Sequence, residues 1–411
     1  MNHSPLAEAH IRVVEQRIAD LATLSGSRDR EGRLGAATGK AEGDGRSIEL
    51  DLVPWGVSEE SSDPSCMLVA DYGELESEYA AIRRGTAMMD RADRGLVELR
   101  GPDASDLISR LVTNVLPDGD ETTQAYVLAR TGRVLSDLRM IVRGESVLLD
   151  LDRTDAELVV EHLGSFVFAE EVEIIDHTPE RHRIELYGPD VEVAFKAACP
   201  EPPPELRWWL MEQDGTSPVG EMALAIDAPI ALIESIWDKI ISTTPEARRP
   251  PRAIGWHAFN IARIEAGSAI FHVDFGPDAL PHETGMIPRR VSFKKGCYPG
   301  QEVVARMESR GKSKRKLVGL RVQGHELPIA GGQVFKPDAE DPELIGKQVG
   351  VITSSTLAPM LGAVPIAFAS IGRAGFDEGT TLRVVADGRT TEVTVGPLDF
   401  LAAEKSGGED S

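Results

Sequence analysis

The feature that most constrains the fold is a change of sequence texture near residue 317. From there to residue 402, short β-prone runs such as KLVGLRV, GKQVGVITS and TTEVTVGPL are separated by Gly, Pro and Asp. Many short strands divided by turn residues are typical of an all-β barrel or sandwich. We therefore predict a C-terminal all-β barrel domain over residues 313–405.

The preceding part of the chain mixes strand and helix signals. In RGLVELRGPDASDLISRLVTNVL (94–116), a strand runs into Gly-Pro-Asp and then into an amphipathic helix that Asp103 could cap. YGPDVEVAFKAAC (187–199) repeats this order, which suggests two related α+β halves. Similar patterns predict strands at 125–129, 133–142, 146–151, 172–176 and 182–187, and helices at 154–163, 230–241 and 253–265. We predict an α+β body over residues 49–312.

The N-terminal region, residues 1–48, has a different character. Apolar residues at helical spacing predict one amphipathic helix over residues 5–23. The segment 25–46 is rich in Gly and charge and has no aromatic residue, which is typical of a disordered linker. We expect the helix to be an appendage that the globular body does not need.

Composition narrows the cellular setting. The three cysteines among 411 residues are widely scattered, which argues against disulfides and cysteine-based zinc sites and favours a reducing cytoplasm. No run approaches the ~18 apolar residues of a membrane span, and the first twenty residues lack the apolar core of a secretory signal. The net charge of −23 should repel nucleic acid and anionic membranes. We expect a cytoplasmic monomer with no metal site.

One segment reverses this charge. Between Arg289 and Lys316, ten basic residues stand against two acidic ones, so the local net charge is 10 − 2 = +8. Such a run is either a solvated surface or an anion site. It surrounds Cys297, the residue with the strongest chemical signal in the chain.

Lys294 and Lys295 precede Cys297, and nearby positive charge favours a thiolate over the free thiol of pKa ~8.5. Pro299 and Gly300 fit the second and third positions of a turn, and a helix should follow, whose N-terminus also stabilises an anion. Two alternatives remain: a reactive thiol, or a small residue packed beneath the turn. His257, His272 and His282 are candidates for a nearby base, or ordinary structural histidines. The chain has no P-loop, GxGxxG, GxSxG or HExxH motif.

The run KKGCYPGQEVVAR (294–306) resembles the Lys-Gly-Cys-(Phe/Tyr)-x-Gly-Gln-Glu signature of YgfZ proteins, folate-binding relatives of the glycine-cleavage T-protein (aminomethyltransferase). AMMDRADRGLVELRGPDASDLISRLVTN (87–114), IARIEAG (261–267) and GVITSSTLAPMLG (350–362) are similar to T-protein segments, so the resemblance spans about residues 70–402. It implies a three-lobed fold, with two α+β lobes around a central folate cavity and a C-terminal all-β barrel. It also implies tetrahydrofolate, or a one-carbon derivative, as cofactor.

The resemblance also implies site residues. Cys297 would be the reactive group, assisted by Lys295, and Asp137, Glu221 and Arg263 would contact folate. For Arg263 an ion pair with Glu265 or another neighbour is an equal alternative. T-proteins carry an Asp-Asp pair where this chain has Ser136 and Asp137. A serine cannot supply a carboxylate's charge, which disfavours glycine-cleavage activity. The remaining motif residues are Lys294, Gly296, Tyr298, Gly300, Gln301 and Glu302.

YgfZ proteins are linked to iron–sulfur enzymes and, by older annotation, to tRNA modification. The main hypothesis is therefore a folate-binding protein that supports assembly or repair of iron–sulfur clusters in client enzymes, with those enzymes or assembly factors as partners. The alternatives are a folate-dependent one-carbon (aminomethyl) transferase and an accessory factor for tRNA modification. The sequence leaves open whether the protein turns over a substrate.

Overall fold

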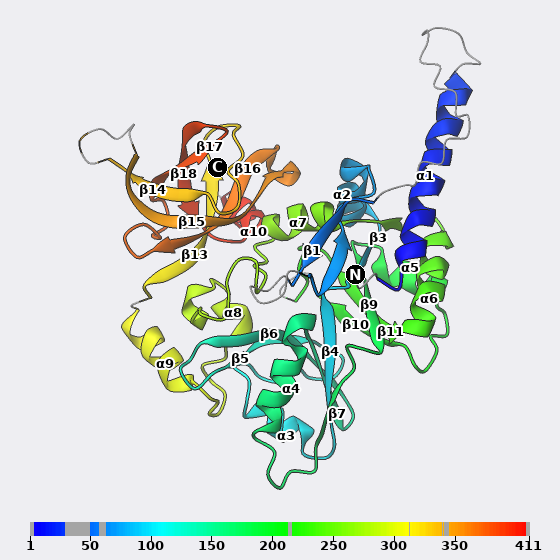
Figure 1. Cartoon of the computed structure of the whole chain (residues 1–411), viewed down its shortest axis with the longest axis horizontal. Helices are drawn as coiled ribbons and strands as arrows, with labels where there is room; N and C mark the ends of the chain where they lie inside the picture. The colour runs from blue at the N-terminus through cyan, green and yellow to red at the C-terminus, as the bar shows by residue number, and fades with distance from the viewer. Residues whose placement is uncertain are drawn as a thin grey trace.

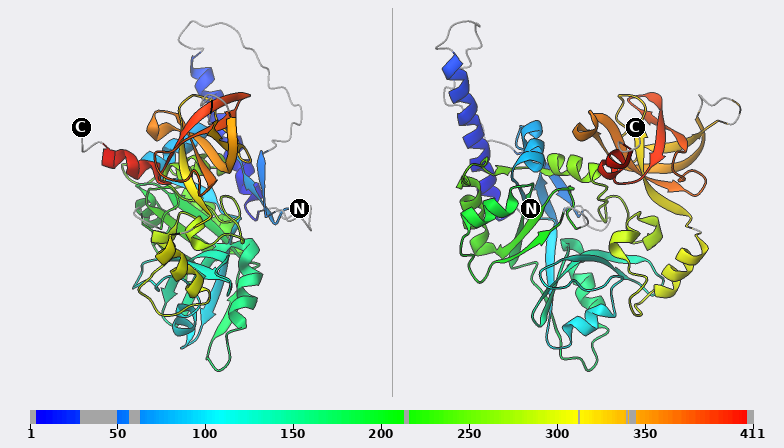
Figure 2. Two further views of the ribbon diagram at one scale, coloured as in Figure 1. Left: turned by 90° about the vertical axis from the view of Figure 1, so that its left-hand side faces the viewer. Right: turned by 180° about the vertical axis from the view of Figure 1, so that it is seen from behind.

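The computed structural model describes residues 4–28, 50–56, 63–212, 216–311, 313–338, 340 and 345–407. Two α+β lobes and a β-barrel are arranged around a common centre, with the barrel joined to the lobes through α7, α8 and α9 (Figure 1). The rear view in Figure 2 shows the same three parts. The predicted α+β, T-protein-like architecture is confirmed.

The first lobe contains a five-stranded sheet in the order β10-β11-β9-β3-β12. Helices α5 and α6 cover it, and its inner strands β9 and β11 are buried. Strand β11 is mostly apolar, whereas β9 also carries charged residues. The elements of this lobe are α2 (Leu75–Arg84), β3 (Ala87–Asp90), β9 (Arg181–Tyr187), α5 (Val191–Ala198), β10 (Arg207–Met211), β11 (Ala223–Pro229), α6 (Ile230–Ser242) and β12 (Arg252–Ala253). A separate two-stranded ribbon consists of β1 (Leu52–Trp55) and β2 (Cys66–Val69).

The second lobe has a sheet in the order β5-β6-β7-β4-β8, with α3 and α4 on one face. Its elements are β4 (Arg94–Arg100), α3 (Ala104–Ser109), β5 (Thr123–Leu128), β6 (Val134–Arg143), β7 (Ser146–Asp152), η2 (Arg153–Asp155), α4 (Ala156–Gly164) and β8 (Glu173–Asp176). All of them lie between β3 and β9 in sequence, so the second lobe is inserted into the first.

The two predicted Gly-Pro-Asp turns occupy matching places. Gly101 follows β4 with φ +138°, and Gly188 follows β9 with φ +123°. A side chain at either position would collide with a backbone carbonyl of its own lobe, so both turns need glycine. Asp103 does not cap α3 as expected, because its carboxylate accepts a hydrogen bond from Glu171 N (2.9 Å) instead.

The third part is a closed barrel in the order β13-β16-β15-β14-β17-β18, which confirms the predicted C-terminal barrel. Alternate residues of its strands point inward and form one apolar core. Its strands are β13 (Arg315–Val322), β14 (Gln333–Pro337), β15 (Ile345–Ala358), β16 (Val364–Gly372), β17 (Thr381–Ala386) and β18 (Arg389–Gly396), with η4 (Pro359–Leu361) and the final helix α10 (Phe400–Gly407). The connecting elements are α7 (Trp256–Glu265), η3 (Pro281–Glu283), α8 (Ile287–Arg290) and α9 (Gln301–Arg310).

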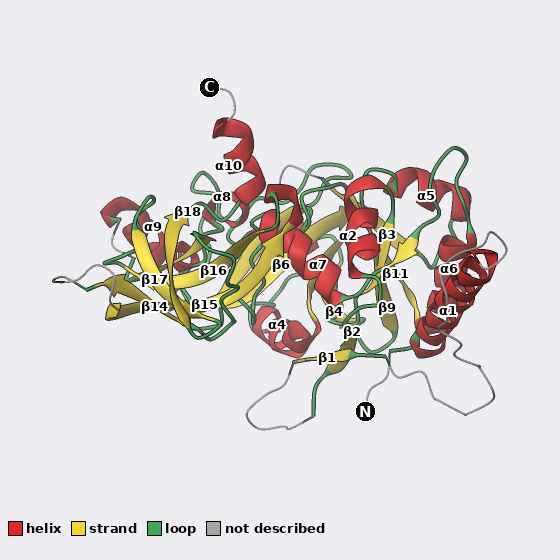
Figure 3. Cartoon of the chain, turned by 90° about the horizontal axis from the view of Figure 1, so that it is seen from above, coloured by secondary structure: helices red, strands yellow, loops and turns green. Residues whose placement is uncertain are grey.

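The N-terminal helix α1 (Ala7–Arg28) differs from the expected appendage. Its first turns lie on the first lobe beside α6 (Figure 3), where Leu6 and Ala9 are buried. Its far end projects from the body (Figure 1). His10 Nε2 lies 2.8 Å from Asp90 Oδ2, and His182 Nε2 lies 2.7 Å from Asp90 Oδ1, so one buried carboxylate joins the helix to the sheet. Most of the predicted linker, residues 29–49, lies outside the described residues. No helix in the described part of the chain is long and apolar enough to cross a membrane.

Candidate active site between the lobes

A polar cavity of about 80 Å³ lies where the two α+β lobes meet the segment 268–271 and α8. Strands β4, β6 and β7 of the second lobe and β9 of the first supply its charged walls. Among the described residues, five arginines and four carboxylates line it: Arg91, Arg94, Arg139, Arg289, Arg290, Asp93, Asp137, Asp152 and Glu185. Charges at this density inside a protein must be paired, and the pairing defines the site.

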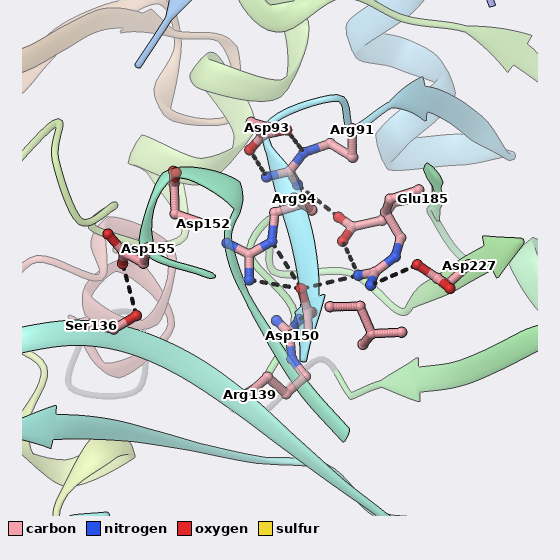
Figure 4. Close-up of polar contacts among 12 residues, drawn as sticks. Arg91, Asp93, Arg94, Ser136, Arg139, Asp150, Asp152, Asp155, Glu185 and Asp227 are labelled. Carbon is pink, nitrogen blue, oxygen red and sulfur yellow. Dashed lines mark hydrogen bonds and ion pairs between the residues drawn. The ribbon is translucent and has the colours of Figure 1, made fainter. Parts of the chain in front are cut away.

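Asp150 is the centre of this charge cluster (Figure 4). It is fully buried, and the guanidinium groups of Arg94, Arg139 and Arg183 reach its oxygens at 2.8, 2.5 and 3.0 Å. Burial alone would raise the pKa of Asp150, but these three cations lower it well below its usual range. The Nε atom of Arg139 is buried and has no hydrogen-bond partner among the described residues, so a donor at the cavity wall is free.

A second group of ion pairs is centred on Arg91, above Asp150 in Figure 4. Arg91 donates two hydrogen bonds to Asp93, at 2.8 and 2.6 Å, and one to Glu185 at 2.7 Å. Its guanidinium also stacks over the Phe259 ring, 4.7 Å from the centroid. Both acids therefore remain fixed at the cavity wall.

Asp152 has a different environment. Trp55 Nε1 donates to its Oδ2 at 2.8 Å, and the backbone N–H and hydroxyl of Thr154 donate to its Oδ1. No arginine bonds it in the described structure. Burial, with the negative charges of Asp93 and Asp155 nearby, raises the pKa of Asp152 above its usual value despite these hydrogen bonds. The Asp152 carboxylate is therefore shifted toward its protonated form.

Asp137, predicted to contact folate, does line the cavity. Arg290 Nε donates to both of its oxygens, at 2.9 and 3.1 Å, while Arg290 Nη1 donates to Gln124. The pair joins β6 to α8 at the cavity edge. Asp137 can accept further hydrogen bonds from a ligand without a new charge being buried.

Ser136, where T-proteins have an Asp, points toward another carboxylate. Its hydroxyl donates to Asp155 Oδ2 at 2.7 Å (Figure 4). His272 Nε2 lies 2.7 Å from the other oxygen, Asp155 Oδ1. Burial lowers the pKa of His272, but the hydrogen bond to the Asp155 carboxylate and its negative charge together outweigh burial and raise the pKa above its usual value. His272 has φ +68°, a left-handed conformation unusual for a residue with a side chain. Ser136 therefore lies against the carboxylate of Asp155.

Two predicted folate contacts lie outside this cavity. Arg263 is fully buried and bonds Asp274 and Ser354, each at 2.7 Å, so it fastens α7 to barrel strand β15. Its Nε donates to Asn260, which leaves the guanidinium with protein partners throughout. The ion-pair alternative therefore describes Arg263, although with Asp274 rather than Glu265. Glu221 lies 3.5 Å from Arg83 on the first lobe, away from the cavity lining.

The Cys297 motif forms the predicted turn. Gln301 N donates to Tyr298 O at 3.2 Å, and Gly300 has φ +79°, as the third position of a type II turn requires. The Tyr298 side chain is buried against the β5–β6 hairpin, and burial raises its pKa to about 12. A side chain on Gly300 would come within 2.8 Å of Ala129 O, so the turn sits directly on the hairpin.

The two lysines and Cys297 of this motif have different surroundings. Cys297 and Lys294 are exposed, whereas Lys295 is half buried and donates to the carbonyl oxygens of Ser109 (2.7 Å) and Val112 at the end of α3. Burial lowers the pKa of Lys295 to about 8. The Lys295 ammonium thus donates its hydrogen bonds to backbone carbonyls of the second lobe.

The other motif residues and histidines have protein contacts. Glu302 bonds Arg306 one turn along α9 at 2.6 Å, and Gly296 is exposed. His282 Nε2 lies 3.0 Å from Glu308 Oε2, and the exposed His257 lies 4.0 Å from Asp71. The Cys297 motif and the cavity are thus separate places, since no motif residue lines the cavity.

Sequence reasoning missed most of the charge cluster. A signal existed: Asp150 and Asp152 alternate with leucines inside a predicted strand, as do Arg139 and Asp137 in the strand before it. Charges at alternate positions of an otherwise apolar strand indicate that one face meets something polar. Their partners come from other strands, and the spacing within one strand does not reveal them.

Comparison with known proteins agrees with this geometry. Residues 315–401 match the family model of the glycine cleavage T-protein C-terminal barrel domain. The chain is 27% identical over 315 residues to an aminomethyltransferase of Rubrobacter xylanophilus, covering 72% of this chain and 79% of that protein. It is 26% identical over 358 residues to an aminomethyltransferase of Moorella thermoacetica, covering 82% and 93%.

The fold has a counterpart of known structure. The crystal structure of the glycine cleavage system aminomethyltransferase T from Bartonella henselae matches with a TM-score of 0.73 at 20% identity, covering 86% of this chain and 94% of that one. That likeness shows a shared three-part fold. The C-terminal barrel thus matches the T-protein barrel domain, and the chain as a whole is similar in sequence and fold to aminomethyltransferases.

Proposed function

We propose that the chain binds a reduced folate in the central cavity and acts in folate-dependent one-carbon transfer of the aminomethyltransferase type. The observation that carries the proposal is the cavity itself, where carboxylates and arginines from both lobes converge in a chain with this fold. Its relatives are named aminomethyltransferases, which favours this alternative over the iron–sulfur hypothesis.

The side chains at the cavity suit a folate chemically. A pterin presents parallel N–H donors that a carboxylate such as Asp137 can accept, and folate carries a carboxylate tail that arginines bind. The free Nε of Arg139 and the cavity-facing Arg289 provide donors for such an anion. The volume of about 80 Å³ is below the roughly 300–1,000 Å³ of small-molecule pockets, so binding requires the walls to move apart.

Each cavity carboxylate has a separate task in this proposal. Asp137, held in place by Arg290, orients the ligand by accepting its N–H groups. Asp152, whose pKa is raised, carries the proton that is taken up or released at its Oδ2 atom. Tetrahydrofolate, when bound, accepts the one-carbon unit. Ser136 and Asp155 keep a negative charge behind the cavity wall in place of the missing Asp.

A matched pair of variants tests the binding. Tetrahydrofolate at 100 times its Kd should raise the free energy of unfolding by about 2.7 kcal/mol. Arg139→Gln should weaken this effect, whereas Arg143→Gln on the same strand should not, because Arg143 faces Asp120 outside the cavity. No stabilisation by millimolar tetrahydrofolate would refute the folate assignment.

The transfer step needs its own test. Asp152→Asn should retain tetrahydrofolate binding but lower the rate of one-carbon transfer at least a hundredfold, as removal of a general acid or base does. An unchanged rate would exclude Asp152 from proton transfer. The wild-type protein could also bind folate but produce no methylenetetrahydrofolate from an aminomethyl donor. That result would show a folate-binding protein without transferase activity, as the YgfZ resemblance predicts.

The iron–sulfur hypothesis remains as a second candidate because Cys297 is exposed beside a basic segment. Both the iron–sulfur hypothesis and the finer assignment to YgfZ proteins depend on the sequence motif around this cysteine. Replacing Cys297 by Ala should lower the activity of iron–sulfur enzymes in the host if the hypothesis holds. Unchanged activities would contradict it.

A further inference from the structure

A second concave site lies on the opposite side of the first lobe. We call it the α1 cleft: it lies between α1, α2, α6 and the segment 249–253, and its volume is about 1,000 Å³. No residue lines both this cleft and the central cavity. Its size suits a cofactor-sized ligand, whereas crevices between packed helices are normally filled by side chains.

The floor of the α1 cleft is apolar with one exception. Ala9, Pro251 and Ala253 are buried there, and Ile241 forms part of the wall. Trp237 also belongs to the floor and is fully buried, yet its indole Nε1 has no hydrogen-bond partner in the described part of the chain. Buried donors are nearly always satisfied, so this unpaired N–H favours a ligand atom that accepts from it once side chains at the floor shift, since the nitrogen itself is not exposed in the cleft.

The rim of the α1 cleft is basic. Five arginines and two carboxylates line it among the described residues: Arg12, Arg17, Arg84, Arg249, Arg252, Glu74 and Asp238. Three of the arginines bond acids on α2 and α6, through contacts of 2.5 to 3.1 Å. Arg84 and Arg249 have no acidic partner in the described structure.

The backbones of these two arginines lie near one another, and both side chains are exposed. A Cβ atom added to Gly85 would lie 4.0 Å from Arg249 Cβ, which places Arg249 beside the end of α2, where Arg84 lies. Arg84 is expected to gain a little from the dipole at this helix end, but that does not account for a second arginine. The chain as a whole has a net charge of −23, whereas this end of the cleft carries two arginines without acidic partners in the described structure above an apolar floor.

We propose that the α1 cleft binds a phosphorylated small molecule with a planar or apolar body, of the class of a nucleoside diphosphate. Arg84 and Arg249 hold the phosphates, because guanidinium groups bind phosphate through paired hydrogen bonds. The body of the ligand lies on the apolar floor and accepts a hydrogen bond from Trp237 Nε1. The proposal is independent of the folate cavity.

The test is titration of the full-length protein with ADP and, separately, with inorganic pyrophosphate, by calorimetry at two salt concentrations. ADP should bind, more weakly at higher salt, and the double variant Arg84→Ser/Arg249→Ser should lose at least tenfold in affinity. The control is Arg389→Ser on the barrel, which also replaces an exposed arginine by serine. This variant should bind ADP as the wild type does. Trp237→Phe assigns one indole N–H signal in NMR spectra, and ADP should shift that signal in the wild type.

Three results would overturn the proposal. One is no binding of ADP at millimolar concentration. Another is equal affinity of the double arginine variant and the wild type. The third is equal affinity of ADP and pyrophosphate with no shift of the Trp237 signal, which would show that the apolar floor takes no part. The wild-type NMR signal makes the last outcome readable even if the Trp237 variant folds poorly.

Discussion

Replacing Asp150 by Asn should destabilise the protein strongly although the side chain keeps its size. Asp150 is fully buried and is the shared partner of three arginines. Arg183 also lies 3.5 Å from Asp227, and Arg139 also bonds Thr216 O, but Arg94 has no other acid within hydrogen-bond distance in the described part of the chain. Removing one member of a buried ion pair costs about 3–5 kcal/mol, and we expect the loss in unfolding free energy to fall in that range.

Urea unfolding followed by tryptophan fluorescence measures this loss, and Asp120→Asn is the matched control. Asp120 makes the same kind of pair with Arg143, at 3.3 Å, but its side chain is almost wholly exposed, so its replacement should change stability little. Equal urea midpoints for the two variants would refute the reasoning that burial makes the Asp150 pairs indispensable.

The pH dependence gives the same prediction a second readout. Because the folded-state pKa of Asp150 is depressed, its stabilisation is fully present above the unfolded pKa of about 3.9 and is lost as pH falls toward the folded value. The stability difference between wild type and Asp150→Asn should therefore be constant from pH 5 to 8 and shrink below about pH 4. A difference that already shrinks near pH 6 would point to another titrating group.

The remaining predictions concern the surfaces around the site. Leu6→Ala should lower the unfolding free energy by about 2–4 kcal/mol, because Leu6 is fully buried, whereas Ile11→Ala on the exposed face of α1 should change it little; equal effects would restore the appendage interpretation. Gly300→Ala should destabilise by more than about 1 kcal/mol, since φ +79° and the nearby hairpin carbonyl both oppose a side chain, and an unchanged melting temperature would contradict this. Iodoacetamide should alkylate the exposed Cys297 much faster than Cys66, whose pKa burial raises to about 12; mass spectrometry showing equal rates would exclude a reactive Cys297.

Much of the fold could be predicted because its signals are local. Alternation within strands, Gly-Pro-Asp turns and the Pro299–Gly300 turn each depend on a few adjacent residues, and all of these turned out as expected. The far partners could not be predicted in the same way. Arg263 pairs with Ser354, which lies 91 residues later in the chain, and no local pattern encodes that distance.

The candidate site shows the same limit. Asp137 was predicted to contact folate because its neighbourhood resembles the T-protein hairpin; it lines the cavity, and the folate contact stays a prediction. The Asp150 cluster brings together residues of β4, β6, β7 and β9, and only the packing of the two sheets reveals that they meet. The burial of α1 could not be predicted, because an amphipathic helix can either pack on the body or stand apart from it. Its apolar stripe does not identify the surface that it covers.

The insertion of the second lobe between β3 and β9 has a consequence for protein synthesis. All strands of that lobe lie within residues 94–176, so it can close its sheet soon after this segment leaves the ribosome. The first lobe must wait, because β3 pairs with β9 and with β12, which ends at Ala253. Helix α1 is made before both lobes but meets its partners on α6 only when residues 230–242 have emerged, so a helix synthesised early is among the last to find its place.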